Sequence, residues 1–289
     1  MTKMGFFRLL RPHQYIKNLF VFAPVFFSFN LDIYIIFKTF IVFALFSLLA
    51  SSIYIINDIK DLEEDRKHPV KKHRPIASGI IKPFTAALTS ITLALTAFIS
   101  AFFLSSNLLL VFLIYFVLNI AYSFKLKHIA IVDIAIIATG FVLRLYAGNS
   151  VTDIELSKWI IVVTFLLALF LAVAKRRDDV LLSTRGHQTR KNIDGYNLEF
   201  VNATMVLMSG VVIVAYLLYS VSPSVIERLG TDNLFITTFF VVLGIMRYMQ
   251  ITFVEQNSGS PTRIVIKDRF LQVTIFLWIT LFFVLVKLV

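Results

Sequence analysis

The chain has 289 residues, of which 58% are hydrophobic and 16% charged, and its mean hydropathy is +0.84. A soluble domain of this length cannot bury so much apolar surface, which excludes a water-soluble globular protein. The net charge is +11, which in a soluble protein would suggest nucleic acid. In a membrane protein whose basic residues lie mainly on one side, as argued below, we instead expect anionic lipid and anionic substrates as partners, and no nucleic acid. The absence of cysteine excludes disulfides and thiolate metal sites.

Apolar runs long enough to cross a bilayer recur along the whole chain. We therefore predict an all-α, polytopic membrane protein that forms one integral membrane domain over residues 1–289. Before the first apolar run, apolar residues alternate with Arg8 and Arg11, which predicts a short interfacial helix. The nine predicted transmembrane helices cover residues 19–37, 39–57, 84–104, 107–124, 129–148, 157–175, 198–220, 233–253 and 270–288.

The orientation in the membrane follows from the basic residues. Of the 28 Lys and Arg residues, 23 lie in the N-terminal segment and in the loops on the same side. This bias predicts a cell-membrane protein whose N-terminus and long loops are cytoplasmic and whose C-terminus is outside. Carboxylates also gather on this side, although the rule that places Lys and Arg in the cytoplasm does not require it. Their presence favours a cytoplasmic active site built from the loops. The opposite side carries only Lys38, Lys158, Arg228 and Lys287.

The most informative stretch begins at Asn57, directly after the second predicted span, and contains Asp58, Asp61 and Asp65. At spacings i, i+3 and i+7, these three carboxylates share one face of a helix and repel one another unless a cation lies among them. Hard oxygen ligands suit Mg²⁺, which proteins usually hold together with substrate phosphates. We therefore predict that these aspartates are catalytic metal ligands, assisted by Asn57. The alternative is that the stretch is an ordinary solvated loop between two spans.

The basic run from Arg66 to Arg74 follows at once and supplies donors for the same phosphates. The run is followed by the sequence Arg-Pro-Ile-Ala-Ser-Gly at residues 74–79, and this specific pattern favours a binding site over a solvated loop. Carboxylates for a metal next to cations for phosphate, at the end of a membrane span, predict a phosphate-handling site at the membrane surface. The candidate phosphate ligands of the whole chain are Lys17, Lys71, Arg74, Lys127, Lys175 and Arg176.

The second inner turn carries Tyr122 and Lys127, and Asp133 follows at the start of the fifth span. Tyr122 and Lys127 can reach a phosphate while Asp133 orients them or binds metal, but Tyr and Lys at a membrane boundary are also common anchors, and both interpretations stay open. Arg144 lies about 16 Å farther along the same helix, where a charge needs a buried partner or a wet cavity. A substrate-binding and a structural role are both open for it. Gly148 is expected to serve close helix packing.

The third inner loop begins with Lys175 and Arg176, followed by Asp178 and Asp179. A basic run after a span is usually a stop signal, but opposite the acidic stretch it can also clamp a polyanion. Near the end of the chain, Asp268 is placed to cap the last predicted helix.

Several of these motifs resemble those of a known family. The pattern Asn57-Asp58-x-x-Asp61-x-x-x-Asp65 at the end of the second of nine spans resembles the first motif of the UbiA prenyltransferase superfamily. The segments 11–18, 68–75 and 140–148 are closer to its decaprenyl-phosphate phosphoribosyltransferase branch, and the ending at Arg247-Tyr248 and Asp268-Arg269 agrees. The third loop departs from the aromatic prenyltransferases, because Lys175-Arg176-Arg177-Asp178 stands where those enzymes carry a second aspartate-rich motif. Their Tyr-x-x-x-Lys element is also changed after Tyr122.

The resemblance implies a UbiA-like helical bundle with Mg²⁺-dependent transfer chemistry at a cytoplasm-facing cavity. It implies transfer of 5-phosphoribose from phosphoribosyl diphosphate to a polyprenyl phosphate, with release of diphosphate. The alternatives are transfer of a prenyl group from a polyprenyl diphosphate to an aromatic or other small acceptor, and a lipid or ion transporter, which Arg144 supports best. The sequence favours no particular oligomeric state or prenyl chain length.

Overall fold

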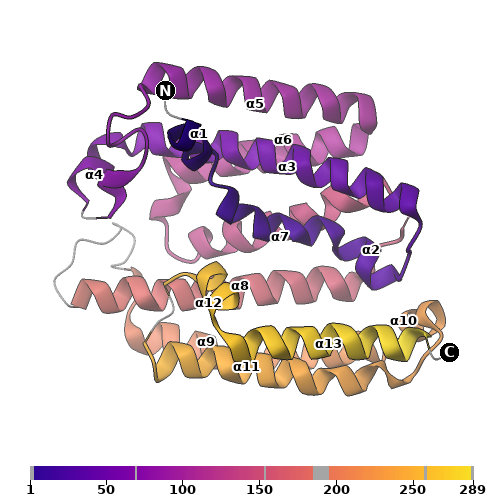
Figure 1. Cartoon of the computed structure of the whole chain (residues 1–289). Coiled ribbons are helices and arrows are strands. Elements are labelled where there is room, and N and C mark those ends of the chain that lie inside the picture. The colour runs from indigo at the N-terminus through magenta and orange to yellow at the C-terminus, as the bar shows by residue number, and fades with distance from the viewer. Residues whose placement is uncertain (1–2, 69, 153, 185–194, 257–258, 288–289) are drawn as a thin grey trace. The chain divides into compact units, whose positions relative to one another are not determined.

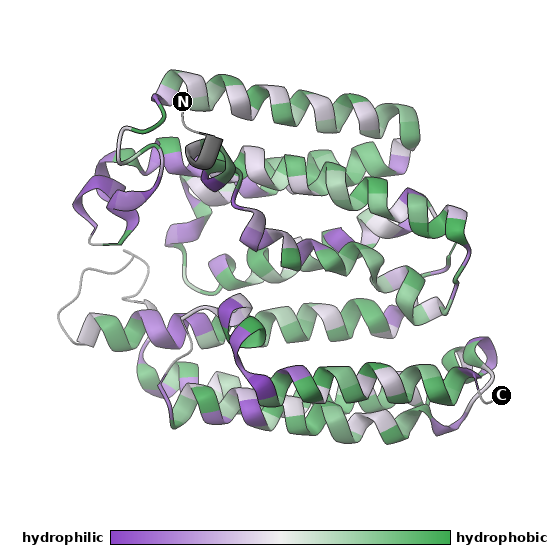
Figure 2. Cartoon of the chain, in the orientation of Figure 1, coloured by the Kyte–Doolittle hydropathy of each residue, from purple (hydrophilic) through white to green (hydrophobic). Residues whose placement is uncertain are grey.

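The computed structural model describes residues 3–68, 70–152, 154–184, 195–256 and 259–287, and in this part of the chain all regular secondary structure is helical (Figure 1). Eight helices within the described residues are long and apolar enough to cross a membrane. Figure 2 shows hydrophobic residues along these helices and hydrophilic residues mainly near their ends. The prediction of an all-α, multi-pass membrane protein is confirmed. The eight are α3 (Ile33–Lys60), α5 (Pro83–Leu104), α6 (Ser106–Phe124), α7 (Val132–Asn149), α8 (Lys158–Thr184), α9 (Leu198–Ser220), Asn233–Phe253 and α13 (Arg269–Lys287).

The first of the nine predicted spans, residues 19–37, is not confirmed as a transmembrane helix. This stretch contains the end of the 3₁₀ helix η1 (Pro12–Phe22), the short helix α2 (Ala23–Ser28) and the start of α3. Phe29 breaks the run with a left-handed backbone, φ 54°. Asp32 then caps α3 by accepting a hydrogen bond from the backbone N–H of Tyr34 at 2.7 Å. The apolar composition predicted one helix here, but the turn and the cap divide it.

The described chain forms two compact units. Unit 1 comprises residues 1–126 and 143–154, and unit 2 comprises residues 127–142 and 155–289. Helix α7 contributes to both units, because its residues up to Val142 belong to unit 2 and those from Leu143 onward belong to unit 1.

Unit 1 is built around the packing of α3 against α5. The buried face of α5 consists of small residues, so the two backbones can approach closely. The Ser90 hydroxyl donates a hydrogen bond to the Ser52 carbonyl across this contact at 2.9 Å. On another side of α3, the Phe46 ring packs edge-on against Phe112 of α6. The small residues of α5 are Ala86, Ser90, Ala94, Ala97 and Ala101.

Helix η1 runs antiparallel to the C-terminal half of α3, and two hydrogen bonds define this register. Tyr15 and Ser51 are joined through their hydroxyls at 2.9 Å, and the Asn18 amide donates to Ser47 at 2.9 Å. At the far end of η1, the carbonyl oxygen of Val21 lies so close to Gly148 of α7 that a Cβ at Gly148 would be 1.9 Å from it. This contact confirms the predicted packing role of Gly148.

We expect Gly148→Ala to lower the free energy of unfolding by about 1–3 kcal/mol, because the clashing atom belongs to a backbone that cannot rotate away. The matched control is Gly210→Ala in α9, where an added Cβ has no neighbour within 4 Å. Thermal unfolding in detergent measures both variants. Equal midpoints for the two would contradict the close approach of η1 to α7.

Unit 2 is built around the packing of α8 against α9, with α11 (Thr238–Phe253) and α13 completing its core. Arg177 of α8 is buried and donates hydrogen bonds to the Asn202 side chain at 2.8 Å and to the Thr252 carbonyl at 2.7 Å. It thereby links α8, α9 and α11. Short helices α10 (Pro223–Leu229) and α12 (Pro261–Lys267) connect the long ones.

Asp268 caps α13, as the sequence predicts. Its carboxylate accepts a hydrogen bond from the Leu271 backbone N–H at 2.8 Å and another from the Arg247 guanidinium at 2.7 Å. The bond from Arg247 holds the pKa of Asp268 below its usual value. This pair ties the start of α13 to α11.

Candidate active site

The acidic stretch does not form one continuous helix. Helix α3 ends at Lys60, Asp61 lies at the break, and a short helix, α4 (Leu62–Lys67), follows. The backbone N–H of Asp65 still donates to the Asp61 carbonyl at 2.8 Å, so the turn is tight. Asp58 and Asp65 are buried, with exposed fractions of 3% and 2%, and Asp61 is half-buried.

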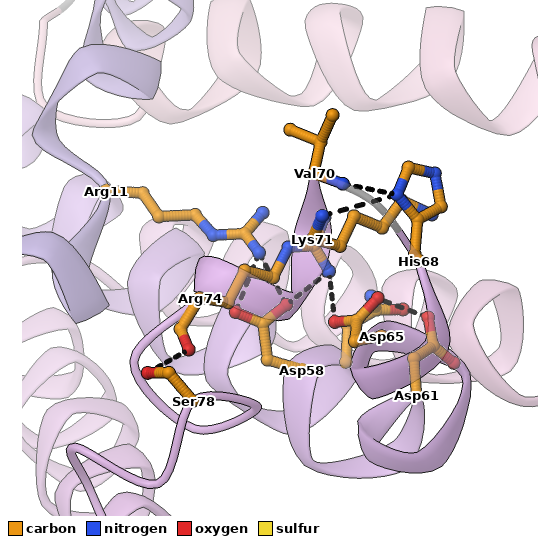
Figure 3. Close-up of polar contacts among 10 residues, drawn as sticks. Arg11, Asp58, Asp61, Asp65, His68, Val70, Lys71, Arg74 and Ser78 are labelled. Atoms are coloured by element: carbon orange, nitrogen blue, oxygen red, sulfur yellow. Dashed lines mark hydrogen bonds and ion pairs between the residues drawn. The ribbon is translucent and has the colours of Figure 1, made fainter.

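Two arginines lie against Asp58 and Asp65 (Figure 3). Arg11, which precedes η1, donates from Nη2 to both oxygens of Asp58, and the contact to Oδ2 measures 2.7 Å. Arg74, which follows the 3₁₀ turn η2 (Lys71–His73), donates from a single atom, Nη1, to Asp58 Oδ1 at 3.0 Å and to Asp65 Oδ2 at 2.6 Å. Oxygens of two carboxylates therefore converge on one positively charged nitrogen.

Asp61 is engaged differently, because its Oδ2 accepts a hydrogen bond from the Asn57 amide at 3.1 Å. Among the described residues, no three His, Asp or Glu groups are arranged to hold a metal ion. The donor chemistry of Asp58 and Asp65 nevertheless fits a hard divalent cation, since their oxygens already meet at one cationic atom. The assignment of Asp58, Asp61 and Asp65 as metal ligands stays a prediction.

Arg11 is the residue of this cluster that sequence reasoning missed as a ligand. It lies 47 positions before Asp58, and its backbone has the left-handed conformation, φ 54°. The following Pro12 disfavours helical geometry at Arg11 and thus separates α1 (Lys3–Leu10) from η1. The Arg-Pro dipeptide signals a break in the chain, but it does not show where the side chain points.

The loop that carries Arg74 is held by local hydrogen bonds. The His68 ring nitrogen Nδ1 accepts from the backbone N–H groups of Val70 at 3.1 Å and Lys71 at 3.3 Å, and the Ser78 hydroxyl donates to the Arg74 carbonyl at 2.8 Å. Burial, followed by the positive charge of Lys71, lowers the pKa of His68, so the ring stays neutral and able to accept. Lys71 belongs to this loop and is half-buried, in the same unit as Asp58.

Arg144 is buried at 4% exposure among polar and aromatic groups of unit 1. It donates to Asn18 Oδ1 at 2.9 Å and to the Tyr115 hydroxyl at 3.1 Å. Its guanidinium carbon lies 4.9 Å from the centre of the Phe46 ring and 5.2 Å from that of Tyr115. These contacts supply the buried guanidinium of Arg144 with the partners that a charged group within a membrane-spanning helix needs.

Lys17 precedes Asn18 on η1 and is half-buried. Burial, followed by the positive charges of Arg144 and Arg11, lowers the pKa of Lys17 to about 8. The positive charges of Arg144 and Arg11 therefore act on Lys17, and an anion bound beside Lys17 would be stabilised by them.

Asp133 and Arg176 form a fully buried ion pair in unit 2. Arg176 Nε donates to Asp133 Oδ2 at 2.6 Å, and its Nη1 donates to Asp179. The Tyr196 hydroxyl donates to Asp133 Oδ1 at 2.6 Å and accepts from the backbone N–H of Ile131 at 2.7 Å. Burial, followed by the bond to Asp133, raises the pKa of Tyr196. The sequence predicts Asp133 and Arg176 as substrate ligands, whereas the structure pairs them with each other and with Tyr196.

The remaining predicted ligands, Tyr122, Lys127 and Lys175, are half-buried. Tyr122 lies in the last turn of α6, where the Lys60 ammonium donates to the carbonyls of Ser123 at 2.7 Å and Phe124 at 2.9 Å. Lys127 lies in the 3₁₀ turn η3 (Leu126–His128). Lys175 lies beside Arg176 inside α8, which continues to Thr184, so the prediction that the third loop begins at Lys175 is wrong. The part of the third loop from 185 to 194 lies outside the described residues.

Comparison with known proteins identifies the family. The profile of the UbiA prenyltransferase family matches residues 19–265, which is most of the chain. The chain belongs to the UbiA prenyltransferase family. Among solved structures, a UbiA homologue from Archaeoglobus fulgidus bound to GPP and Mg²⁺ superimposes with a TM-score of 0.73, at 19% identity, over 98% of this chain and 99% of that one. The same homologue bound to DMAPP and Mg²⁺ gives a TM-score of 0.72. The UbiA fold is therefore shown for nearly the whole chain.

Relatives within the family are more similar in sequence. The decaprenyl-phosphate phosphoribosyltransferase of Mycolicibacterium smegmatis is 33% identical over 95% of this chain and 90% of its own length. The enzyme of the same name from Corynebacterium glutamicum is 31% identical over 95% of this chain and 84% of its own length. Both alignments extend over almost all of this UbiA protein.

Proposed function

We propose that this UbiA protein transfers 5-phosphoribose from phosphoribosyl diphosphate to a polyprenyl phosphate, and releases diphosphate. The observation that carries the proposal is the buried pair Asp58 and Asp65, whose oxygens converge on arginine at the end of a membrane span. Near full-length similarity to decaprenyl-phosphate phosphoribosyltransferases supports this substrate pair.

The reaction replaces one C1–oxygen bond of ribose by another. As the bond from C1 to the leaving diphosphate breaks, positive charge develops on the sugar ring, and a carboxylate of the acidic stretch can stabilise it. An oxygen of the lipid phosphate attacks C1 from the opposite face. That oxygen is already ionised at neutral pH, so no general base is needed. Magnesium, when bound, would neutralise the leaving diphosphate.

We propose that Asp58, Asp61 and Asp65 hold this Mg²⁺, with Asn57 orienting Asp61. Arg11 and Arg74 are placed beside the same carboxylates and suit the diphosphate of the donor, because a guanidinium binds phosphate oxygens in a bidentate manner. Lys17 and Lys71, in the same unit, are candidates for the second phosphate. We further propose that this site and the N-terminus face the cytoplasm, as the distribution of Lys and Arg favours.

The direct test uses purified protein with Mg²⁺, labelled phosphoribosyl diphosphate and polyprenyl phosphate. We expect a lipid-extractable ribose product that acid hydrolyses, and no product after chelation of the metal. The family name and the neighbours bound to prenyl diphosphates favour a second candidate, transfer of a prenyl group to a small acceptor. Labelled prenyl diphosphate with an aromatic acceptor tests it in parallel. Turnover in the second assay alone would replace the first proposal.

The lowered pKa of Lys17 predicts how substrate binding depends on pH. Lys17 is charged below pH 8 and loses its proton as the pH rises through about 8, well below the ordinary value of 10.5. If Lys17 binds a substrate phosphate, the KM for that substrate should rise between pH 7 and pH 9. In Lys17→Arg, whose side chain stays charged, KM should stay flat over the same range. Parallel KM profiles for the two proteins would contradict phosphate binding by Lys17.

The same shift affects stability in a definite direction. The folded protein disfavours the charged form of Lys17, so this penalty is present below pH 8 and is relieved as the pH rises from about 8 toward 10.5. Unfolding midpoints measured without substrate should therefore rise relative to those of Lys17→Arg over this interval.

A further inference from the structure

The hydrogen-bond geometry of Asp58 raises a problem for metal binding. A carboxylate offers about four acceptor positions on its two oxygens. Within the described residues, Arg11 occupies one position on each oxygen and Arg74 occupies a second position on Oδ1. Oδ1 is therefore already saturated by arginine. A metal ion cannot coordinate Oδ1 directly unless one of these guanidinium groups moves away.

Asp65 has a related arrangement. Its Oδ2 accepts from the same Arg74 nitrogen that contacts Asp58, so a cationic atom lies between the two carboxylates. Both carboxylates are almost fully buried, and a buried negative charge without a partner is strongly destabilising. The two arginines therefore satisfy the charges that a metal would otherwise satisfy.

The two arginine side chains are more exposed to solvent than the two aspartates. The side chains of Arg11 and Arg74 are 19% and 26% exposed, against 3% and 2% for Asp58 and Asp65. Arg74 also lies on a loop, and Arg11 lies at a junction between two helices. A phosphate arriving from the aqueous side would meet the guanidinium groups before it met the carboxylates.

We propose that Arg11 and Arg74 are exchangeable counter-ions of the metal site. Without metal, they hold Asp58 and Asp65 by ion pairs. When the metal and a diphosphate bind together, the carboxylate oxygens pass to the metal and the guanidinium groups pass to the phosphate oxygens. This inference rests on the metal-site part of the proposed function and does not depend on the identity of the transferred group.

The exchange predicts effects of opposite sign for one substitution, Arg11→Gln. Metal alone must compete with Arg11 for Asp58, so removing Arg11 should tighten binding of Mn²⁺ by about fivefold or more. Metal with inorganic diphosphate gains Arg11 as a phosphate ligand, so the same substitution should weaken binding of the Mn²⁺–diphosphate complex by a similar factor. Electron paramagnetic resonance of Mn²⁺, titrated into detergent-purified protein, measures both affinities without turnover.

The matched control is Arg66→Gln. Arg66 lies on the same acidic stretch and pairs with Glu63 at 2.8 Å, but both side chains are exposed and Glu63 is not a proposed ligand. We expect this variant to bind both probes as the unchanged protein does. In the Asp58→Asn background, Arg11→Gln should no longer alter the affinity for Mn²⁺.

A second variant guards against poor folding of Arg11→Gln. Arg74→Gln removes the other guanidinium from Asp58 Oδ1, and should show the same pair of opposite changes. Both variants should also gain a larger rise in melting temperature from Mg²⁺ than the unchanged protein, because tighter binding stabilises more.

Weaker binding of both probes, or unchanged binding of both, would overturn the exchange. Failure of both variants to fold even with Mg²⁺ would also overturn it, since the metal should then replace the missing charge. A positive result without ribose transfer would reject the proposed substrate and keep the exchange.

Discussion

Asp58→Asn should abolish turnover while the protein remains folded. The substitution keeps the shape of the side chain but removes the charge that holds a divalent cation. Loss of the several kcal/mol that a metal contributes to the transition state lowers kcat by about 10³-fold or more. Product formation from labelled phosphoribosyl diphosphate measures the loss, and circular dichroism with thermal unfolding checks the fold. Asp61→Asn should have the same effect on turnover.

The control for this prediction lies on the same stretch. Glu63 has a 74% exposed side chain whose ion pair is with Arg66, so Glu63→Gln should leave kcat within about twofold of the unchanged value. Retained activity in both Asp58→Asn and Asp61→Asn would reject the metal assignment. Equal loss in all three variants would instead indicate a general requirement for negative charge on this loop.

Asp133→Asn should destabilise the fold rather than weaken substrate binding. The substitution leaves Arg176 buried with less negative charge beside it and removes a charged acceptor from Tyr196. Breaking a buried ion pair by neutralising one partner costs about 3–5 kcal/mol. Thermal unfolding in detergent should show this as a large drop in midpoint, with KM unchanged at temperatures where the variant is folded.

Asp179→Asn is the matched control, because Asp179 pairs with the same Arg176 but has a 20% exposed side chain. A partly solvated pair contributes less, so we expect a loss of about 1 kcal/mol or less. If Asp133→Asn melted like the unchanged protein and raised KM instead, Asp133 would be a substrate ligand, as the sequence alone suggests.

The sequence predicts the helices well because membrane spans follow from local apolar composition. The predicted span at residues 19–37 is not confirmed, because the turn at Phe29 and the cap at Asp32 are small signals within an apolar run. The i, i+3 and i+7 spacing predicts that Asp58 and Asp65 lie close together, and both carboxylates do contact Arg74. It places Asp61 on the same helical face, whereas the helix breaks there.

The partners of the site residues were harder to predict, because they come from distant parts of the chain. Arg11 reaches Asp58 across 47 residues, and Tyr196 reaches Asp133 across 63. No local pattern shows that an arginine before Pro12 points at a carboxylate of the next long helix. Burial of Asp133 and Arg176 likewise depends on how α7 and α8 pack, which charge patterns alone do not reveal.

The division of α7 between the two units affects how the protein is made. Unit 1 includes residues 143–154, which follow a segment of unit 2 in the chain. Asn18 and Tyr115 leave the ribosome well before Arg144, the residue that donates to both. Unit 1 therefore cannot finish folding during translation until the whole of α7 has been synthesised, and a nascent chain arrested before residue 143 should be readily cleaved by protease at η1.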